Sequence, residues 1–140
     1  FQLVCDFFRC VANRYPQEES YSEALNSVLT KLIGVTMLRH LTPRGPGERE
    51  GNADAAIVYT PLGAPRHFII IREDKLGSGS GGGDSLVELV GHYQNILLCD
   101  PSKPTSPTLL VEVVGARLTL SLAACDSERN ISITPAVVSK

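Results

Sequence analysis

The order of hydrophobic patterns along the chain constrains its fold most strongly, because helical spacing and strand-like alternation occur in separate blocks. Apolar residues recur at intervals of three and four in residues 1–15, 17–34 and 85–100, which is the spacing of amphipathic helices. Three extended segments lie between the second and third helical blocks, and three more follow the third block. The sequence therefore predicts an α/β (α+β sandwich) fold with a mixed sheet.

The extended segments are short, rich in β-branched residues and separated by turn-forming residues. They read VTMLRHLTP (35–43), ADAAIVYT (53–60), RHFIIIREDK (66–75), TLLVEVVG (108–115), ARLTLSLAA (116–124) and ISITPAVV (131–138). The third helical block begins after Asp84, and Ser85 with Glu88 fits the S-x-x-E capping box. Gly34 is placed to end the second helix.

Length and composition favour a single domain. At 140 residues the chain can bury one core, and we expect an N-terminal helix in 1–15 and the main core in 17–125. The chain begins with Phe1 rather than methionine, so we expect it to be a piece of a longer protein. The N-terminal segment is too short and too charged to span a bilayer, which predicts no membrane association.

Charge and cysteine content narrow the possible partners and compartments. The net charge of −2 gives no general attraction to nucleic acid, so such binding would need a local basic patch. The four cysteines form no CxxC pair, which argues against a zinc site or a disulfide framework. We therefore expect an intracellular location, in the nucleus or cytoplasm.

A candidate site lies at the end of the third extended segment. Side chains alternate along a strand, so Glu73 and Lys75 share one side while Arg72 and Asp74 share the other. If the preceding segment pairs with it as an antiparallel hairpin, Asp54 comes to lie beside Glu73.

Two carboxylates at one corner are suited to a hard divalent cation. Asp54 and Glu73 would ligate Mg²⁺ or Mn²⁺ together with the backbone carbonyl of Asp74, and water and phosphate oxygens would fill the other positions. Lys75 would then position the attacking water. The acids at the start of the second helix, Glu18, Glu19 and Glu23, are further candidates, and Glu18 lies in line with the core-facing Tyr21 and Leu25. A solvated helix start that favours negative charge is the alternative explanation of Glu18.

The pattern of Asp54, Glu73 and Lys75 on consecutive strands resembles the PD-(D/E)XK (restriction-endonuclease-like) nuclease superfamily, whose core order is α-β-β-β-α-β. The stretch from Glu73 to Tyr93 more specifically resembles the nuclease-like domains of fungal kinase-associated and Crinkler-type effector proteins. The matching positions in the turn and helix are Gly82, Gly83, Asp84 and Tyr93. The chain departs from the pattern at Ser85, where proline is usual, and at Glu88, where glutamine is expected.

This resemblance implies a function. The expected activity is metal-dependent hydrolysis of DNA phosphodiester bonds by an endonuclease, with a β-hairpin added after the core. Asp54, Glu73 and Lys75 would be catalytic, and Gln94 or Glu88 would assist from the helix. The implied partners are DNA, or RNA, a kinase-like domain in the same protein and a second copy of the chain in a homodimer.

Further residues are candidates for contact with nucleic acid. These are Arg39, Arg44 and Arg72 for phosphates, Gly82 and Gly83 for close approach of the backbone, and Tyr93. Ordinary surface charge is the alternative explanation of the arginines.

Three other interpretations remain open. The glycine run formally contains G-x-G-x-x-G, but REDKL separates it from the apolar strand, which is atypical of a dinucleotide-binding fold. An engineered linker would also explain GSGSGGG. A catalytically inactive module on the same fold, binding a kinase-like or other partner, is the main alternative to a nuclease.

Overall fold

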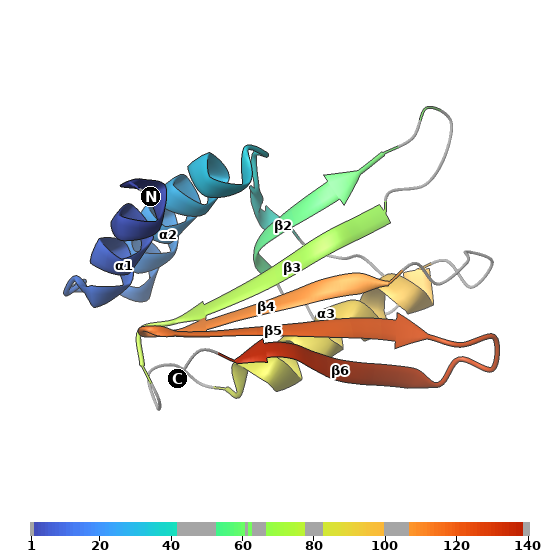
Figure 1. The fold of residues 1–140 in the computed structure, drawn as a ribbon. Coiled ribbons are helices and arrows are strands. Elements are labelled where there is room, and N and C mark those ends of the chain that lie inside the picture. Colours follow the sequence, from blue (N-terminus) through green and yellow to red (C-terminus); the bar gives the residue numbers. More distant parts are fainter. Residues whose placement is uncertain are drawn as a thin grey trace.

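The described residues form a mixed α/β arrangement of one sheet and three helices (Figure 1). This computed structural model describes residues 2–41, 53–60, 62, 67–77, 83–99 and 107–138. The α/β class and the mixed sheet expected from the sequence are both confirmed. The predicted glycine turn at residues 78–82 lies outside the described residues, as does Arg44.

Six strands form one sheet in the order β1-β2-β3-β4-β5-β6. Their bounds are β1 Leu38–Leu41, β2 Ala53–Tyr59, β3 His67–Lys75, β4 Thr108–Val114, β5 Arg117–Cys125 and β6 Ile131–Val138. Every neighbouring pair is antiparallel except β3 and β4, which run parallel. Helix α3, Ser85–Cys99, lies between these two strands in the chain and makes the crossover that a parallel pair requires.

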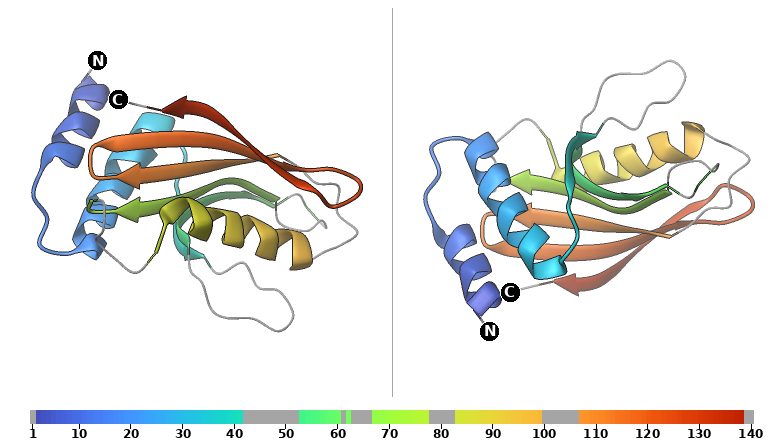
Figure 2. Two further views of the ribbon diagram at one scale, coloured as in Figure 1. Left: turned by 90° about the horizontal axis from the view of Figure 1, so that it is seen from below. Right: turned by 90° about the horizontal axis from the view of Figure 1, so that it is seen from above.

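The helices cover both faces of the sheet (Figure 2). Helices α1, Gln2–Ala12, and α2, Glu18–Ile33, pack together, and α2 lies against one face. Helix α3 lies on the other face. Alternation along the central strands supplies both cores, because neighbouring residues point to opposite faces. Val111 packs beneath α2, for example, whereas its neighbour Leu110 packs beneath α3.

The ends of α2 and α3 are determined by local chemistry. Helix α2 stops at Gly34, which adopts a left-handed conformation with φ of 75° and donates its N–H to Thr30 O at 2.9 Å. Asp84 caps α3, since its Oδ1 accepts the N–H groups of Leu86 and Val87 at 2.9 and 3.2 Å. The predicted capping box is wrong, because the Ser85 hydroxyl donates to Glu112 instead.

The turn between β4 and β5 ties the end of β3 to helix α2. Gly115 has a φ of 56° and donates its N–H to Lys75 O at 2.8 Å. Its own carbonyl accepts the Tyr21 hydroxyl at 2.7 Å. A left-handed residue next to Leu76 O requires glycine here, since an added Cβ would lie 3.3 Å from that oxygen. The backbone at Lys75 is therefore linked through Gly115 to helix α2.

Among the described residues, none of the helices has the length and apolar character needed to cross a membrane.

Candidate functional site

The antiparallel pairing of β2 with β3 brings the first two candidate residues together. Ala55 pairs with Arg72, so the same register continued by one residue sets Asp54 opposite Glu73. Directly opposed residues of an antiparallel pair share a face, with Cβ atoms about 5 Å apart. Asp54 is held further by the backbone N–H of Asp74, which its Oδ2 accepts at 2.8 Å. Its carboxylate is thus fixed at the end of β3.

Glu73 is buried on the α3 side of the sheet. Its Oε1 lies 2.8 Å from Nε2 of His92, a residue on the inner face of α3. Burial raises the pKa of Glu73 to about 7, against a lowering by the His92 hydrogen bond and with a further rise from the charge of Asp54. The protein surroundings of Glu73 therefore stabilise its ionised form less than water does.

Lys75 lies between two acids from different helices. Its Nζ is 3.1 Å from Oε2 of Glu88 on α3 and 3.8 Å from Oε1 of Glu18 on α2. Burial acts to lower the pKa of Lys75, but the Glu88 hydrogen bond and the charges of Glu88, Glu18 and Glu73 outweigh it and raise the pKa. The ammonium group is therefore firmly protonated.

Glu18 contributes a buried oxygen that has no hydrogen-bond partner among the described residues. Its pKa is raised, first by burial and then by the charges of Asp54, Glu88 and Asp74, while Lys75 opposes this rise. Its Oε1 is buried, and no hydrogen-bond partner for it exists in the part of the chain that the structure describes. An orphaned carboxylate oxygen beside other acids is the chemistry that a cation would satisfy.

Gly83 allows Glu88 to reach the lysine. A Cβ at position 83 would lie 2.1 Å from Glu88 Oε1 and 3.1 Å from its Cδ. The Glu88 side chain therefore folds over the glycine backbone, and residue 83 has no room for a side chain unless Glu88 moves. This gives the glycine a packing role that the sequence did not reveal.

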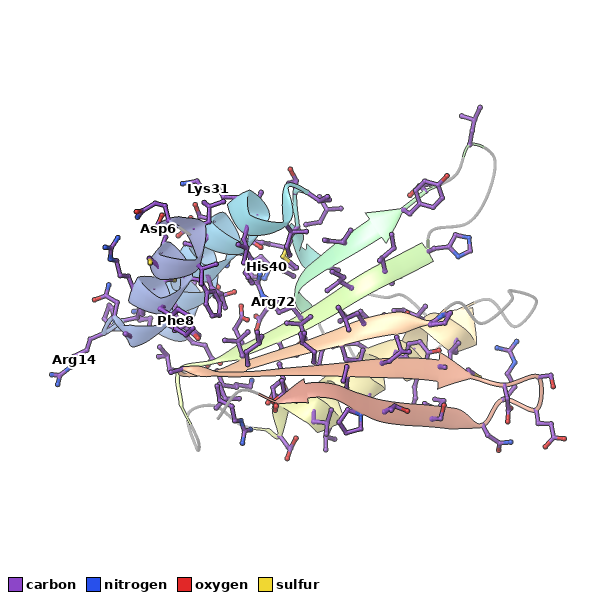
Figure 3. All side chains as sticks on the ribbon, viewed as in Figure 1. Asp6, Phe8, Arg14, Lys31, His40 and Arg72 are labelled. Atoms are coloured by element: carbon purple, nitrogen blue, oxygen red, sulfur yellow. The ribbon has the colours of Figure 1, made fainter. Side chains whose placement is uncertain are left out.

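The opposite side of β3 carries a separate and self-contained charge pair. Arg72 and Asp74 are both fully buried beneath α2, with Arg72 Nη2 2.9 Å from Asp74 Oδ2. Figure 3 shows Arg72 between the strand and the helices. The predicted phosphate contact of Arg72 does not fit this position, because its guanidinium is enclosed and already paired. Alternation explains why it turned inward: α2 covers this face.

Three further predicted residues do not join the cluster. Gln94 is exposed on α3, whereas His92 on the same helix is buried against Glu73. Tyr93 is buried in the core beneath α3, which leaves its ring no surface for stacking on a base. Arg39 pairs with Glu19 on the α2 side. Gly82 lies outside the described residues, so its predicted role is untested.

Sequence reasoning missed His92 and underrated Glu88. Both were visible on one face of the third helix, since residues four apart lie one above the other. The signal that points to them is their spacing from Ser85 and Leu89, whose side chains are buried against the sheet.

The cluster offers oxygen ligands but not a preformed three-residue cage. Across the described ranges, no group of three or more His, Cys, Asp or Glu side chains converges as a metal site. Two strand carboxylates with backbone and water oxygens would still accept Mg²⁺, which usually keeps several waters. A cation bound at this corner would satisfy the Glu18 oxygen that has no hydrogen-bond partner.

Comparison with known proteins gives no match: no family model, curated protein or solved structure corresponds to this chain.

Proposed function

We propose that the chain is a metal-dependent nuclease domain that hydrolyses DNA phosphodiester bonds. The observation that carries this proposal is the corner at the end of β3, where Glu88 and Glu18 lie 3.1 and 3.8 Å from the Lys75 ammonium group and the charge of Asp54 acts on both Glu18 and Glu73. The acids are Glu18, Asp54, Glu73 and Glu88, and the ammonium belongs to Lys75. Such an excess of negative charge around a single cationic side chain favours binding of a hard divalent cation.

The connectivity supports the same proposal. From α2 to β4 the elements follow the order α-β-β-β-α-β, and β5 and β6 add an antiparallel hairpin. This is the order expected for a restriction-endonuclease-like core. Helices α2 and α3 on opposite faces deliver Glu18 and Glu88 to one end of the strand. We propose that the domain has this core topology.

The residues have distinct roles in the proposed reaction. Asp54 and Glu73 would hold Mg²⁺ or Mn²⁺, with Glu18 and the backbone carbonyl of Asp74 at its flank. The bound cation supplies an acidified water and neutralises phosphate charge. Lys75 orients the attacking water and stabilises negative charge near it. His92 holds the Glu73 carboxylate in place from α3, as outer-shell partners of metal ligands do.

The test combines metal binding with cleavage. Wild type is titrated with Mg²⁺ and Mn²⁺ by calorimetry and incubated with plasmid DNA, linear DNA and RNA. We expect cleavage of DNA that requires the metal, and a loss of at least about a hundredfold in Glu73→Gln and Lys75→Ala. Matched controls are Glu128→Gln in the β5–β6 turn and Lys31→Ala on the exposed side of α2, both expected to match wild type. Intact nucleic acid in every lane, together with no metal binding, overturns the proposal.

A specific observation favours the alternative of a non-catalytic interaction module. Large apolar side chains of α1 are exposed, with Phe8 at 61% and Val4 at 45% (Figure 3). Such a surface is typical of contact with another protein domain. This alternative predicts a folded chain that leaves nucleic acid unaltered at every metal concentration.

A further inference from the structure

Asp74 separates Glu73 from Lys75 in the sequence, yet its side chain serves the opposite face of the sheet. It is fully buried beneath α2. Its Oδ2 accepts the Ser22 hydroxyl at 2.7 Å and Arg72 Nη2 at 2.9 Å, and its Oδ1 accepts Arg72 Nε at 2.9 Å. A carboxylate with this many charge-assisted bonds is rigidly oriented.

The remaining donors of Arg72 extend this network along α2. Nη1 lies 3.2 Å from Oδ1 of Asn26, and Nη2 lies 3.4 Å from the carbonyl oxygen of Ser22. Ser22 and Asn26 are four residues apart, so they lie on the same face of the helix one turn apart. Arg72 and Asp74 therefore form hydrogen bonds with two successive turns of α2.

The first turn of α2 has no side-chain cap of its own. Gln17 at the N-cap is extended, with φ of −143° and ψ of 150°, and makes no side-chain cap hydrogen bond. An uncapped helix start is less stable by about 1 kcal/mol and tends to fray. Glu18 lies in that turn, one turn before Ser22, and its carboxylate reaches Lys75 from there.

The same residue also orients the second acid of the site. The backbone N–H of Asp74 donates to Asp54 Oδ2 at 2.8 Å. One strand position thus holds Asp54 through its main chain and contacts the Glu18-bearing helix through its side chain.

We infer that the buried contact of Ser22 with Asp74 and Arg72 positions the Glu18 carboxylate at the candidate cation site. Asp74 and Ser22 are positioning residues: neither touches the cation, and they act through Glu18. This inference rests on the proposed metal-dependent function and adds how the helix-borne ligand is held.

The test is a double-mutant cycle on cation affinity, measured by calorimetry with Mn²⁺ on the whole chain. Ser22→Ala removes one hydroxyl and leaves the Arg72–Asp74 pair intact, so it is preferable to a change at Asp74. We expect Ser22→Ala to weaken Mn²⁺ binding about tenfold, as loss of an outer-shell partner does. In a Glu18→Ala background the same change should alter the affinity less than about twofold, because Glu18 is no longer there to be positioned.

A matched control removes a comparable buried hydrogen bond elsewhere. Thr108 Oγ1 donates to Phe68 O at 2.9 Å, toward the opposite end of β3. Thr108→Val should lower stability as Ser22→Ala does and leave Mn²⁺ affinity unchanged. Equal loss of affinity in the control, or an effect of Ser22→Ala that persists without Glu18, overturns the inference while metal binding by wild type stands. Absence of Mn²⁺ binding in wild type overturns both the inference and the proposed function.

Discussion

The two faces of strand β3 carry the same kinds of charge in very different states. Toward α2, Arg72 and Asp74 are fully buried and neutralise each other within hydrogen-bonding distance. Toward α3 and the sheet end, Glu73 and Lys75 belong to a cluster with more acids than bases. We call the side of β3 with the Arg72–Asp74 ion pair the closed side, and the side with Glu73 and Lys75 the open side.

The difference between the two faces concerns how each buried carboxyl is compensated by its neighbours. Burial raises the pKa of both carboxyls, and at Asp74 the charge of Arg72 and the hydrogen bonds from Ser22 and Arg72 oppose that rise. At Glu73, whose pKa rises to about 7, the hydrogen bond and charge of His92 oppose it. The two carboxyls thus differ in their partners, because Asp74 is the counter-charge of a fully buried guanidinium whereas Glu73 faces a histidine.

The largest expected effect comes from neutralising the closed side. Asp74→Asn leaves the Arg72 guanidinium buried without its counter-charge, so we expect the free energy of unfolding to fall by about 3–5 kcal/mol. Urea denaturation at pH 8 measures this change. The isosteric Glu73→Gln, made one residue away, should be neutral or stabilising at the same pH. A comparable loss in both variants would remove the distinction between the two faces.

The second effect is the pH dependence of stability that Glu73 contributes, which adds to that of Asp74, whose pKa burial also raises. Glu73 has a pKa of about 7 in the folded chain, against an ordinary value of 4.5. Between these pH values the folded chain retains a proton that the unfolded chain has released, so the free energy of unfolding falls as pH rises. The total fall is about 3 kcal/mol at most.

Glu73→Gln removes this dependence, because an amide does not titrate. The measurement is the difference in unfolding free energy between wild type and Glu73→Gln from pH 4 to pH 8. We expect the variant to gain on wild type as pH rises through this window. A difference that stays constant with pH would show that folding does not raise the pKa of Glu73.

The smallest effect tests the contact that holds Lys75. In Gly83→Ala the new methyl group would displace the Glu88 carboxylate, which lies 2.1 Å from the Cβ position, and so break its pairing with Lys75. We expect a stability change below about 1 kcal/mol and a lower pKa of Lys75, since Glu88 is the main group that raises it. NMR titration of the lysine side chain measures the shift.

Gly91→Ala is the matched control on α3. An added Cβ there meets nothing within 4 Å, so the Lys75 pKa should stay at its wild-type position. Stability should rise by about 0.5–1 kcal/mol, because alanine is a better helix former than glycine. An unchanged Lys75 pKa in both variants would mean that Gly83 does not set the position of Glu88.

Much of the fold was predictable because its signals are local. The helical spacing gave α2 and its stop at Gly34, and alternation separated Arg72 and Asp74 from Glu73 and Lys75. The antiparallel pairing of β2 with β3 followed from their proximity in the sequence. These inferences need only periodicities of 3.6 and 2 residues.

The rest depended on how helices dock, which the sequence does not encode locally. Ser85 looked like a capping residue, but docking of α3 brings its hydroxyl to Glu112 on another strand. His92 meets Glu73 only once α3 covers that face. The burial of Arg72 likewise required knowledge that α2 lies over it. The nuclease activity stays a prediction.

The parallel register of β3 with β4 has a consequence for how the chain reaches this structure. In each other strand pair, two antiparallel strands follow each other without a helix between them, so pairing them closes only a short loop. The β3–β4 ladder joins residues 39 positions apart in the chain, such as Ile70 and Leu109 (109 − 70), so among the described strand pairs we expect it to form last. Glu73 and Lys75 belong to this ladder, whereas His92 and Glu88 come from the helix that connects its two strands.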